Sequence, residues 1–440
     1  MNFKIEYTNK DITPYGGMSL MNKLLITSNL KDYLSKCHLP TQGSNRGYKP
    51  EQLIVNFWLG VWSGANNYSN LDITRQDVVI SNIFDWHIMA EHKAFQRYFD
   101  KFTQATNQDV FTSLYNWFFS NLNFDNYALD LDSTVITRYG EQQGAAKGYN
   151  PKKRGRKSHH PLIAFVPDCR MIANFWLRPG NTNDMNNFLS FLEDTVSNKL
   201  KGKRVGLIRA DSGFYSKEIF DYLENNHNGS YNYIIAARFH QRIKWKISDQ
   251  KTWLKLDDGI DIAETTYQAD DWEYPRRIVM VRQEINIRPK ASGKQLKLFE
   301  EEGIYKNYRY SCFITNMNLP AKAIYDLYRK RADSENRIKE IKYDFGAESF
   351  VVKNFWATEA VLNFSMMAYN IMSLFRQAIL RTKSQPFLKT IRHQVFAIAA
   401  YFDEKQNTKV LKLSLSIKRS KMFDALWKNT EKFSWNFNPT

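Results

Sequence analysis

Between residues 127 and 238 the sequence alternates between strand and helix patterns. Strand patterns such as YALDLD (127–132) and VGLIRAD (205–211) are short, apolar or alternating, and followed by turn residues. The members are strands at 127–132, 162–166 and 171–177, a helix at 185–197, a strand at 205–211, a helix at 217–225 and a strand at 232–238. The order β-β-β-α-β-α-β predicts the α/β class, with a mixed sheet.

The regions on either side of this sheet predict other kinds of secondary structure. Helical patterns and Gly- or Asn-rich turns fill the chain before this sheet, strand and turn patterns follow it, and a long helix begins after Pro320. We therefore expect five segments. They are a helical N-terminal domain (1–126), the first part of the α/β core (127–238), a β-rich insertion (239–316), the second part of the core (317–382) and a basic helical C-terminal region (383–440).

Basic residues outnumber acidic ones, with 62 Lys and Arg against 45 Asp and Glu and a net charge of +17. Such an excess favours a polyanionic partner, and nucleic acid before a membrane surface. The excess is local: residues 1–126 carry 11 basic and 11 acidic side chains, whereas 351–440 carry 14 and 5. The core and the C-terminal region are therefore expected to provide most of the salt-sensitive phosphate binding.

Cysteine content and hydropathy indicate the compartment. The three cysteines are too widely spaced for a zinc knuckle or a disulfide framework, which fits a reducing cytoplasm. The first residues, MNFKIEYTNK, lack the apolar stretch of a signal peptide. The most apolar run, at 360–375, contains polar residues and is too short to span a membrane, so we interpret it as a buried core helix.

Two strand ends carry carboxylates. The period of two places Asp130 and Asp132 on one face of their strand, opposite two leucines. Paired acids on an apolar strand are costly unless they are solvated, hydrogen-bonded or bound to a cation. Asp211 ends a later strand, before a turn in which Ser216 can cap the next helix. Either feature alone is also compatible with a strand end that reaches solvent.

A third carboxylate lies in a helical stripe. Tyr328, Arg331, Glu335 and Lys342 are spaced by 3, 4 and 7 residues, which puts all four on one helix face. Taken alone, the stripe is equally typical of a solvated face with salt bridges. Taken with the two strand acids, it can bring three carboxylates to a divalent metal, since Mg²⁺ prefers oxygen ligands. Histidines and cysteines lack zinc spacing, so a zinc hydrolase is disfavoured.

These three motifs resemble the bacterial insertion-sequence transposases of the DDE type, in the branch with a Tyr-x2-Arg-x3-Glu-x6-Lys signature. The signature reads YRKRADSENRIKEIK (328–342), and LDLDST (129–134) and RADSGFYS (209–216) resemble the first and second aspartate motifs. The resemblance covers 127–349. It implies an RNase H-like core interrupted by a β-rich insertion before the last acid, and a DNA transposase that cuts at terminal inverted repeats and joins 3′-hydroxyl ends to target DNA.

Carried over by motif position, the resemblance assigns roles to individual residues. It implies that Asp132, Asp211 and Glu335 are the catalytic, metal-binding triad for two Mg²⁺ or Mn²⁺ ions, which would promote hydrolysis and strand transfer. It implies that Tyr328, Arg331 and Lys342 contact the DNA backbone. Asp130 does not match the family position, and we interpret it as a supporting or structural acid.

Further DNA contacts are predicted outside the triad. A basic loop between the first two strands is a candidate for phosphate binding, with a solvated charge run as the alternative. Its residues are Lys152, Lys153, Arg154, Arg156 and Lys157. In the insertion, Trp245, Trp253 and Trp272 are candidates to stack on an extruded base, with core packing as the alternative for each. RPGNTND (178–184) and the pair His159-His160 are sufficiently explained by capping or packing.

Two other functions remain open from the sequence. A tyrosine recombinase would also be basic and use Arg and Tyr, but it needs a nucleophilic tyrosine and no metal. A domesticated, non-catalytic DNA-binding protein would keep the charge and the fold. For the transposase, the partners implied by the resemblance are double-stranded DNA, as terminal repeats and as target, and a second copy of the chain that pairs two ends. We expect a cytoplasmic, nucleoid-associated bacterial protein.

Overall fold

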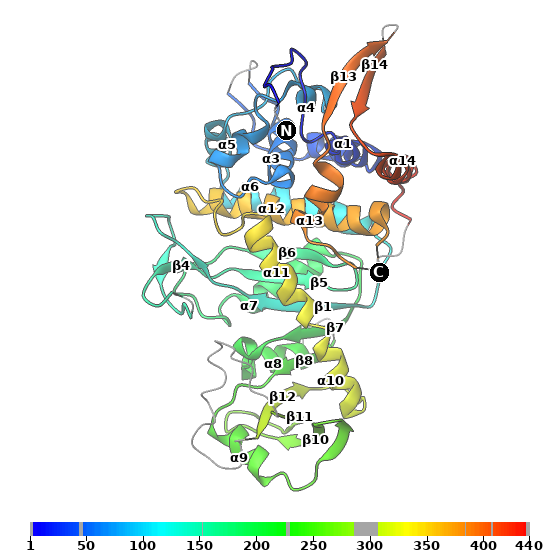
Figure 1. The fold of residues 1–440 in the computed structure, drawn as a ribbon. Helices are drawn as coiled ribbons and strands as arrows, with labels where there is room; N and C mark the ends of the chain where they lie inside the picture. The colour runs from blue at the N-terminus through cyan, green and yellow to red at the C-terminus, as the bar shows by residue number, and fades with distance from the viewer. Residues whose placement is uncertain are drawn as a thin grey trace.

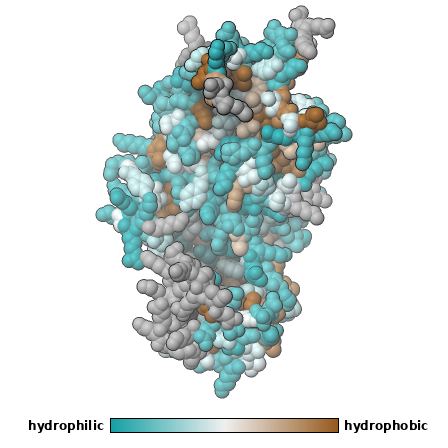
Figure 2. Space-filling model, viewed as in Figure 1, coloured by the Kyte–Doolittle hydropathy of each residue, from teal (hydrophilic) through white to brown (hydrophobic). Residues whose placement is uncertain are grey.

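The computed structural model describes residues 3–43, 47–151, 153–225, 229–285, 307–382, 384–405 and 408–436. Figure 1 shows the N-terminal helices at one end, the core sheet in the middle and the insertion at the other end. The face drawn in Figure 2 is mostly hydrophilic, with apolar side chains in small groups. No helix in the described part of the chain is both long and apolar enough to cross a membrane.

Five strands form the centre of the sheet. They are β1 (Tyr127–Ser133), β5 (Leu162–Val166), β6 (Met171–Trp176), β7 (Val205–Ala210) and β8 (Tyr233–Ala236), in the order β6-β5-β1-β7-β8. β5 is antiparallel to both β1 and β6, whereas β1, β7 and β8 are parallel. The strand predictions and the mixed α/β class are confirmed, and the topology is the RNase H-like one that the resemblance implies.

Helices connect these strands as the sequence predicts. α7 (Phe188–Glu193) continues as the π-helix η2 (Asp194–Lys199), and the 3-10 turn η3 (Ser212–Phe214) leads into α8 (Lys217–Glu224). The hydroxyl of Ser216 accepts a hydrogen bond from the Ile219 backbone N–H, so it caps α8 as expected. A separate three-stranded sheet, in the order β2-β4-β3, stands beside the core; its strands are β2 (Ile136–Thr137), β3 (Ala146–Lys147) and β4 (Lys157–His159).

The insertion extends the core sheet. It contains α9 (Gln241–Asp249), β9 (Leu254–Asp257), β10 (Ile260–Tyr267), β11 (Arg276–Glu284) and β12 (Tyr308–Thr315). β12 pairs antiparallel with β8, at Phe313 and Ala236, and the order β12-β11-β10-β9 continues the sheet to nine strands. The insertion is β-rich as predicted. Its strands cover the edge of β8, which would otherwise present unpaired backbone groups.

The N-terminal part is helical, as predicted. Its elements are α1 (Met18–Thr27), α2 (Leu30–Lys36), α3 (Pro50–Ser63), η1 (Ser69–Thr74), α4 (Val78–Ile83), α5 (His92–Phe99) and α6 (Gln104–Ser120). Of these, α3, α5 and α6 pack on α12 (Phe355–Leu374), which is buried along almost its whole length and also packs on β6. Trp58 and Trp62 donate indole N–H bonds to the backbone carbonyls of Phe364 and Ala368. The run at 360–375 is therefore the buried core helix that its polar residues indicated.

The long helix expected after Pro320 is broken in two. α10 (Ala321–Arg329) and α11 (Ala332–Asp344) are separated by a tight turn in which the Arg331 N–H donates to the Tyr328 carbonyl, at 2.9 Å. The expectation of one continuous helical stripe was wrong, because α10 packs on β10 and β11 of the insertion while α11 packs on α12. The two helices therefore pack on different parts of the protein, and the chain turns between them.

The C-terminal region is only partly helical. After η6 (Phe375–Leu380), α13 (Leu388–Ile391) and η7 (Arg392–Phe396), the strands β13 (Ala400–Lys405) and β14 (Thr408–Leu413) form a hairpin before α14 (Ile417–Glu431). The helical prediction for 383–440 is thus corrected by this hairpin, whose first strand also bridges to Thr13. Because α14 packs on α1, this region belongs to the N-terminal helical body.

Candidate active site

The three predicted acids lie near the carboxyl ends of the neighbouring strands β1 and β7, at the edge of the sheet that these strand ends form. Asp132 is near the carboxyl end of β1, and Asp211 directly follows the neighbouring parallel strand β7. The register pairs Leu131 with Ala210, so the two aspartates continue adjacent strands. Glu335 lies in the first turn of α11. The structure therefore brings together the residues that the three sequence motifs contribute.

Arg331 links two of these acids directly. Its guanidinium lies 2.9 Å from Oδ2 of Asp132 and 3.2 Å from Oε1 of Glu335, and it also donates to the Leu131 carbonyl at 3.3 Å. The Arg331 side chain is 5% exposed, whereas that of Glu335 is 67% exposed. A guanidinium suits this position because it can serve two carboxylates with fixed geometry. Arg331, expected to face DNA phosphate, here bridges Asp132 and Glu335.

The electrostatics indicate crowded negative charge. Burial, together with the charges of Asp211 and Glu335 and against the opposing charge of Arg331, raises the pKa of Asp132 to about 7. Burial likewise raises the pKa of Asp211, against the opposing effects of Arg331 and of the Gly213 N–H. One guanidinium therefore has to compensate several carboxylates, so the edge can accept additional positive charge.

The residues fit a hard divalent cation in chemistry and charge, since all three triad side chains offer carboxylate oxygens. Within the described ranges, however, no group of three His, Cys, Asp or Glu side chains is close enough to hold a metal ion. Arg331 donates a hydrogen bond to Oε1 of the exposed Glu335 carboxylate.

The other two signature residues contact the strands that carry the acids. The Tyr328 hydroxyl donates to the Ala210 carbonyl at 3.5 Å, and its ring packs on Phe313 with centroids 4.4 Å apart. Burial raises the pKa of Tyr328 to about 12, which is unfavourable for a tyrosine nucleophile at neutral pH. Lys342 Nζ donates to the Val135 carbonyl at 3.1 Å, just beyond β1.

Asp130 lies in the interior and accepts hydrogen bonds from Arg209 and Ser334. Arg209 also donates to the Leu327 carbonyl at the end of α10. This arrangement agrees with the prediction of a supporting acid, because the carboxylate binds a buried guanidinium and not solvent. The alternative, a strand end that reaches solvent, does not apply to Asp130.

A fourth carboxylate was missed by sequence reasoning. Asp184 accepts a hydrogen bond from the Ser133 hydroxyl at 2.6 Å and lies 3.0 Å from His160 Nε2, while His160 Nδ1 lies 3.0 Å from the Thr182 carbonyl oxygen. Burial tends to raise the pKa of Asp184, but the bonds from His160 and Ser133 and nearby positive charge hold it below its usual value. Asp184 is therefore a partly buried carboxylate that these contacts hold in its charged form, whereas the sequence was sufficiently explained by helix capping.

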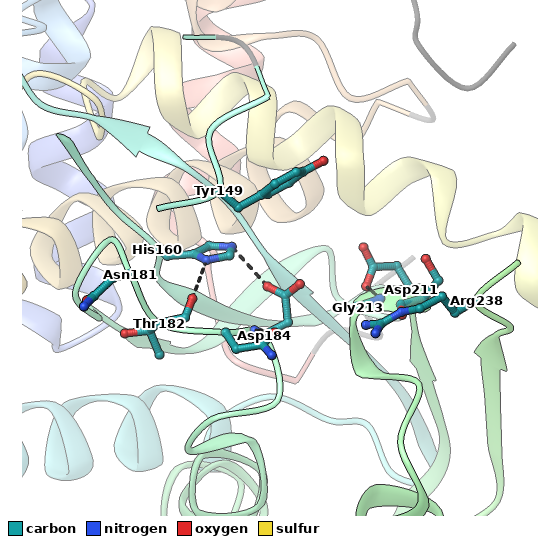
Figure 3. Close-up of a pocket in the computed structure, with 10 residues that line it drawn as sticks. Tyr149, His160, Asn181, Thr182, Asp184, Asp211, Gly213 and Arg238 are labelled. Atoms are coloured by element: carbon teal, nitrogen blue, oxygen red, sulfur yellow. Dashed lines mark hydrogen bonds and ion pairs between the residues drawn. The ribbon is translucent and has the colours of Figure 1, made fainter. Parts of the chain in front are cut away.

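The direction of β6 could have revealed this residue. β6 runs parallel to β1, because both are antiparallel to β5. The carboxyl ends of β6, β1, β7 and β8 consequently lie on the same side of the sheet. Asp132 is near the end of β1, and the loops after β6, β7 and β8 carry Asp184, Asp211 and Arg238. Figure 3 shows His160 and Asp184 on one side of a cleft and Asp211 with Arg238 on the other.

Two clefts open from this edge. One, of about 570 Å³, is lined by Tyr149, His160, Asn181, Thr182, Asn183, Asp184, Asp211, Ser212, Gly213 and Arg238. The other, of about 840 Å³, shares Tyr149, His160, Asp184 and Asp211 and extends between the small sheet and α11 as far as Val351. Both clefts reach Asp184 and Asp211, and the larger one is also lined by Lys342 and Tyr343.

The basic loop lies on the small sheet, between β3 and β4. Lys153 lines the larger cleft, and both Lys153 and Arg156 lie over the Tyr139 ring, at 4.8 and 6.0 Å from its centroid. Lys157 forms an ion pair with Glu141 at 2.9 Å, and Arg154 is exposed. Lys152 lies outside the described residues. The loop thus reaches the larger cleft, which Asp184 and Asp211 also line. Part of its positive charge already interacts with Glu141 and the Tyr139 ring.

The three candidate tryptophans have different environments. Trp272 is 4% exposed and packs on Tyr215, Phe220, Tyr267 and Arg276, which favours the core-packing interpretation. Trp253 is half-buried beneath Arg282. Trp245, on α9, is 57% exposed and is the candidate of the three most accessible to a base.

Comparison with known proteins gives one family. The family model described as "Transposase DDE domain group 1" matches residues 2–435. No curated protein matches the chain. A solved structure, the cryo-EM piggyBac transposase synaptic complex with hairpin DNA, is similar over 97% of this chain and 85% of that chain, with 11% identity and a TM-score of 0.46. The family model covers nearly the whole chain, and the protein is therefore a member of the DDE transposase domain family, group 1.

Proposed function

We propose that the protein is an insertion-sequence transposase of the Tyr-Arg-Glu-Lys branch. It cuts DNA at the terminal inverted repeats of its element and joins the freed 3′-hydroxyl ends to target DNA. One observation carries the proposal: Arg331 pairs with both Asp132 and Glu335, and Asp211 follows the strand next to that of Asp132, in the chain order of the three family motifs. The family match supports the same reaction class.

The proposed cofactor is Mg²⁺ or Mn²⁺, as two ions held by Asp132, Asp211 and Glu335. When bound, the ions would lower the barrier for attack on a phosphodiester by polarising its oxygens and activating the attacking hydroxyl or water. The raised pKa values of Asp132 and Asp211 support this proposal, since they reflect buried carboxylates close to one another that a cation would stabilise in the charged form.

The protein's own residues would position the DNA. Once the ion pair between Arg331 and Glu335 is released, the Arg331 guanidinium can bind a phosphate oxygen. Lys342, beyond it on α11, can hold a second phosphate, and the basic loop can hold the backbone farther along the larger cleft. Tyr328 supports the Ala210 carbonyl immediately before Asp211, and keeps its proton.

The test is cleavage of a duplex that carries the element's own terminal sequence, with Mg²⁺ or Mn²⁺ and with EDTA. We expect metal-dependent cutting by the wild-type protein and a loss of about 100-fold or more in Asp132→Asn, Asp211→Asn and Glu335→Gln, because each removes a charge from the metal site. Asp424→Asn, at an exposed position of α14, is the matched control and should cut normally. Retained cutting by a triad variant would remove that residue from the triad.

The same experiment separates the alternatives. A non-catalytic DNA-binding protein would bind the terminal duplex and leave it intact under every metal condition. A tyrosine recombinase would cut in EDTA and leave a covalent phosphotyrosyl adduct, detectable as protein-linked DNA. Neither outcome is expected, because the three acids are together and Tyr328 is held protonated.

We further propose that the active assembly contains two copies of the chain, one for each transposon end. The partners are then double-stranded terminal repeats and a target duplex, bound in the bacterial cytoplasm at the nucleoid. The mass of the complex with terminal DNA, measured by light scattering, tests the stoichiometry: a ratio of two chains to two ends is expected.

A further inference from the structure

Tyr149 occupies a distinctive place beside the acids. It lines both clefts, and its side chain is 73% exposed although the neighbouring Asn150 is buried. In Figure 3 the Tyr149 ring lies beside His160, on the side of the cleft opposite Asp211. An exposed aromatic ring at the junction of two clefts is a suitable surface for another flat ring.

The backbone that carries Tyr149 is fixed on both sides. A Cβ atom at Gly148 would lie 2.0 Å from the Gly180 carbonyl oxygen, so only glycine permits this close approach to the loop that leads to Asp184. On the other side, the Asn150 amide donates to the Thr137 hydroxyl at 3.0 Å and its oxygen accepts the Lys153 N–H. The ring is therefore presented from a rigid backbone, which lowers the entropy cost of binding.

The surroundings have the composition of a single-strand binding groove. Besides the carboxylates of Asp184, Asp211 and Glu348, the larger cleft contains Lys153 and Lys342 next to Tyr149, so basic side chains and an aromatic platform lie together near the acids. Tyr139 is also exposed there, but Lys153 and Arg156 already lie over its ring. Tyr149 is thus better suited to receive a base.

We propose that Tyr149 stacks on an unpaired base of the DNA strand whose phosphate lies at Asp211. The inference rests on the proposed function and adds a binding site for a nucleobase next to the cleaved bond. A stacked base would orient its own phosphate towards the acids while Lys153 and Lys342 neutralise the neighbouring backbone. Trp245 is the competing platform, located on α9 in the insertion.

The experiment uses the full chain and terminal DNA that ends in a short single-stranded extension containing 2-aminopurine, whose fluorescence falls when it stacks. Binding is carried out in Ca²⁺ and followed independently by anisotropy of a label at the far end. We expect quenching with the wild-type protein and with Tyr149→Phe, which keeps the ring. Tyr149→Ala should abolish the quenching and weaken binding of extended DNA about tenfold, without weakening binding of a blunt duplex.

Three outcomes would overturn the proposal: equal quenching with Tyr149→Ala, loss of quenching with Trp245→Ala alone, or no quenching by wild-type protein at saturation. Thermal unfolding of each variant excludes misfolding, which is not expected at an exposed side chain. The proposed function fails separately, if wild-type protein does not cut the terminal DNA in Mg²⁺ or Mn²⁺. If the wild-type protein cuts the terminal DNA but the 2-aminopurine quenching does not depend on Tyr149, this inference is rejected and the proposed transposase reaction is retained.

Discussion

Arg209 and Asp130 form a bidentate ion pair in the interior, with Nε–Oδ1 and Nη2–Oδ2 distances of 2.6 and 2.9 Å. They lie on adjacent parallel strands, and each precedes a triad aspartate by two residues. Ser334, directly before Glu335, donates to the same Asp130 carboxylate. One buried pair therefore joins β1, β7 and α11, the three elements that carry the acids, and fixes their relative positions.

Loss of one partner of this pair should be costly. Arg209→Met leaves the Asp130 carboxylate buried without its charge partner, and we expect the free energy of unfolding to fall by about 3–5 kcal/mol. The double variant Asp130→Leu with Arg209→Met should recover most of the loss, because no uncompensated charge remains. Urea denaturation measures both.

The matched control is the exposed pair Lys322–Asp326 on α10. Lys322→Met should cost less than about 1 kcal/mol, since exposed ion pairs contribute little. If Arg209→Met lowered the free energy of unfolding no more than Lys322→Met does, the buried pair would not hold the strands together.

A second buried carboxylate predicts a pH dependence. Glu359, on α12, accepts bonds from the Leu177 N–H and the Asn107 amide, yet burial raises its pKa from 4.5 to about 7. Because the folded state holds this proton more tightly than the unfolded state, the stabilisation is complete below about pH 4.5 and is lost as the pH rises through about 7.

Glu359→Gln should therefore remove part of the fall in the free energy of unfolding between about pH 5 and pH 8. Glutamine keeps an acceptor for Leu177, and its amide can donate to Asn107 Oδ1, which has no partner within the described part of the chain. Thermal or urea unfolding across this range, compared with wild type, measures the effect. Parallel pH profiles for the two proteins would contradict a raised pKa at Glu359.

Local patterns were sufficient for the core strands and for placing Asp132 and Asp211 at strand ends, whereas their role in a triad with Glu335 came from the family resemblance and stays a prediction. The apolar runs before Asp132 and Asp211 end at turns, and parallel strands bring such ends to one edge, so the sequence pattern contained the arrangement. The position of Asp184 depended instead on the direction of β6, which periodicity does not reveal. His160 contacts Asp184 across two loops, and such a long-range pair has no local signal.

Tertiary packing decided the remaining features. The chain at 328–331 keeps a helical pattern, but Tyr328 packs on Phe313 of the insertion and Arg331 turns towards Asp132, so the helix breaks between them. Likewise β13 forms where the chain pairs with β14 and bridges to Thr13, a contact between distant segments. Propensity is a weak guide wherever such contacts compete with it.

The basic loop should contribute to the salt dependence of DNA binding. Arg154→Gln with Arg156→Gln removes two exposed charges beside the larger cleft, and the slope of log K against log salt should become shallower by about two. Fluorescence anisotropy at several salt concentrations gives the slope.

The matched control is Lys36→Gln with Lys93→Gln, two exposed lysines of the N-terminal part, which carries no net charge. Its slope should equal that of the wild type. An unchanged slope in the loop variant would mean that the loop is a solvated charge run.

Arg331 should compete with metal for the acids. Its guanidinium compensates Asp132 and Glu335 when no other cation is present, so Arg331→Gln should lower the thermal stability in EDTA. Mn²⁺ should then raise the melting temperature of Arg331→Gln by more than that of wild type, because the ion compensates the same charge without displacing a guanidinium. Thermal unfolding across an Mn²⁺ titration measures both effects. Arg337→Gln, which disrupts the ion pair with Asp333 farther along α11, should lose stability without a larger Mn²⁺ response. A smaller Mn²⁺ response in Arg331→Gln than in wild type would mean that Arg331 helps to assemble the metal site.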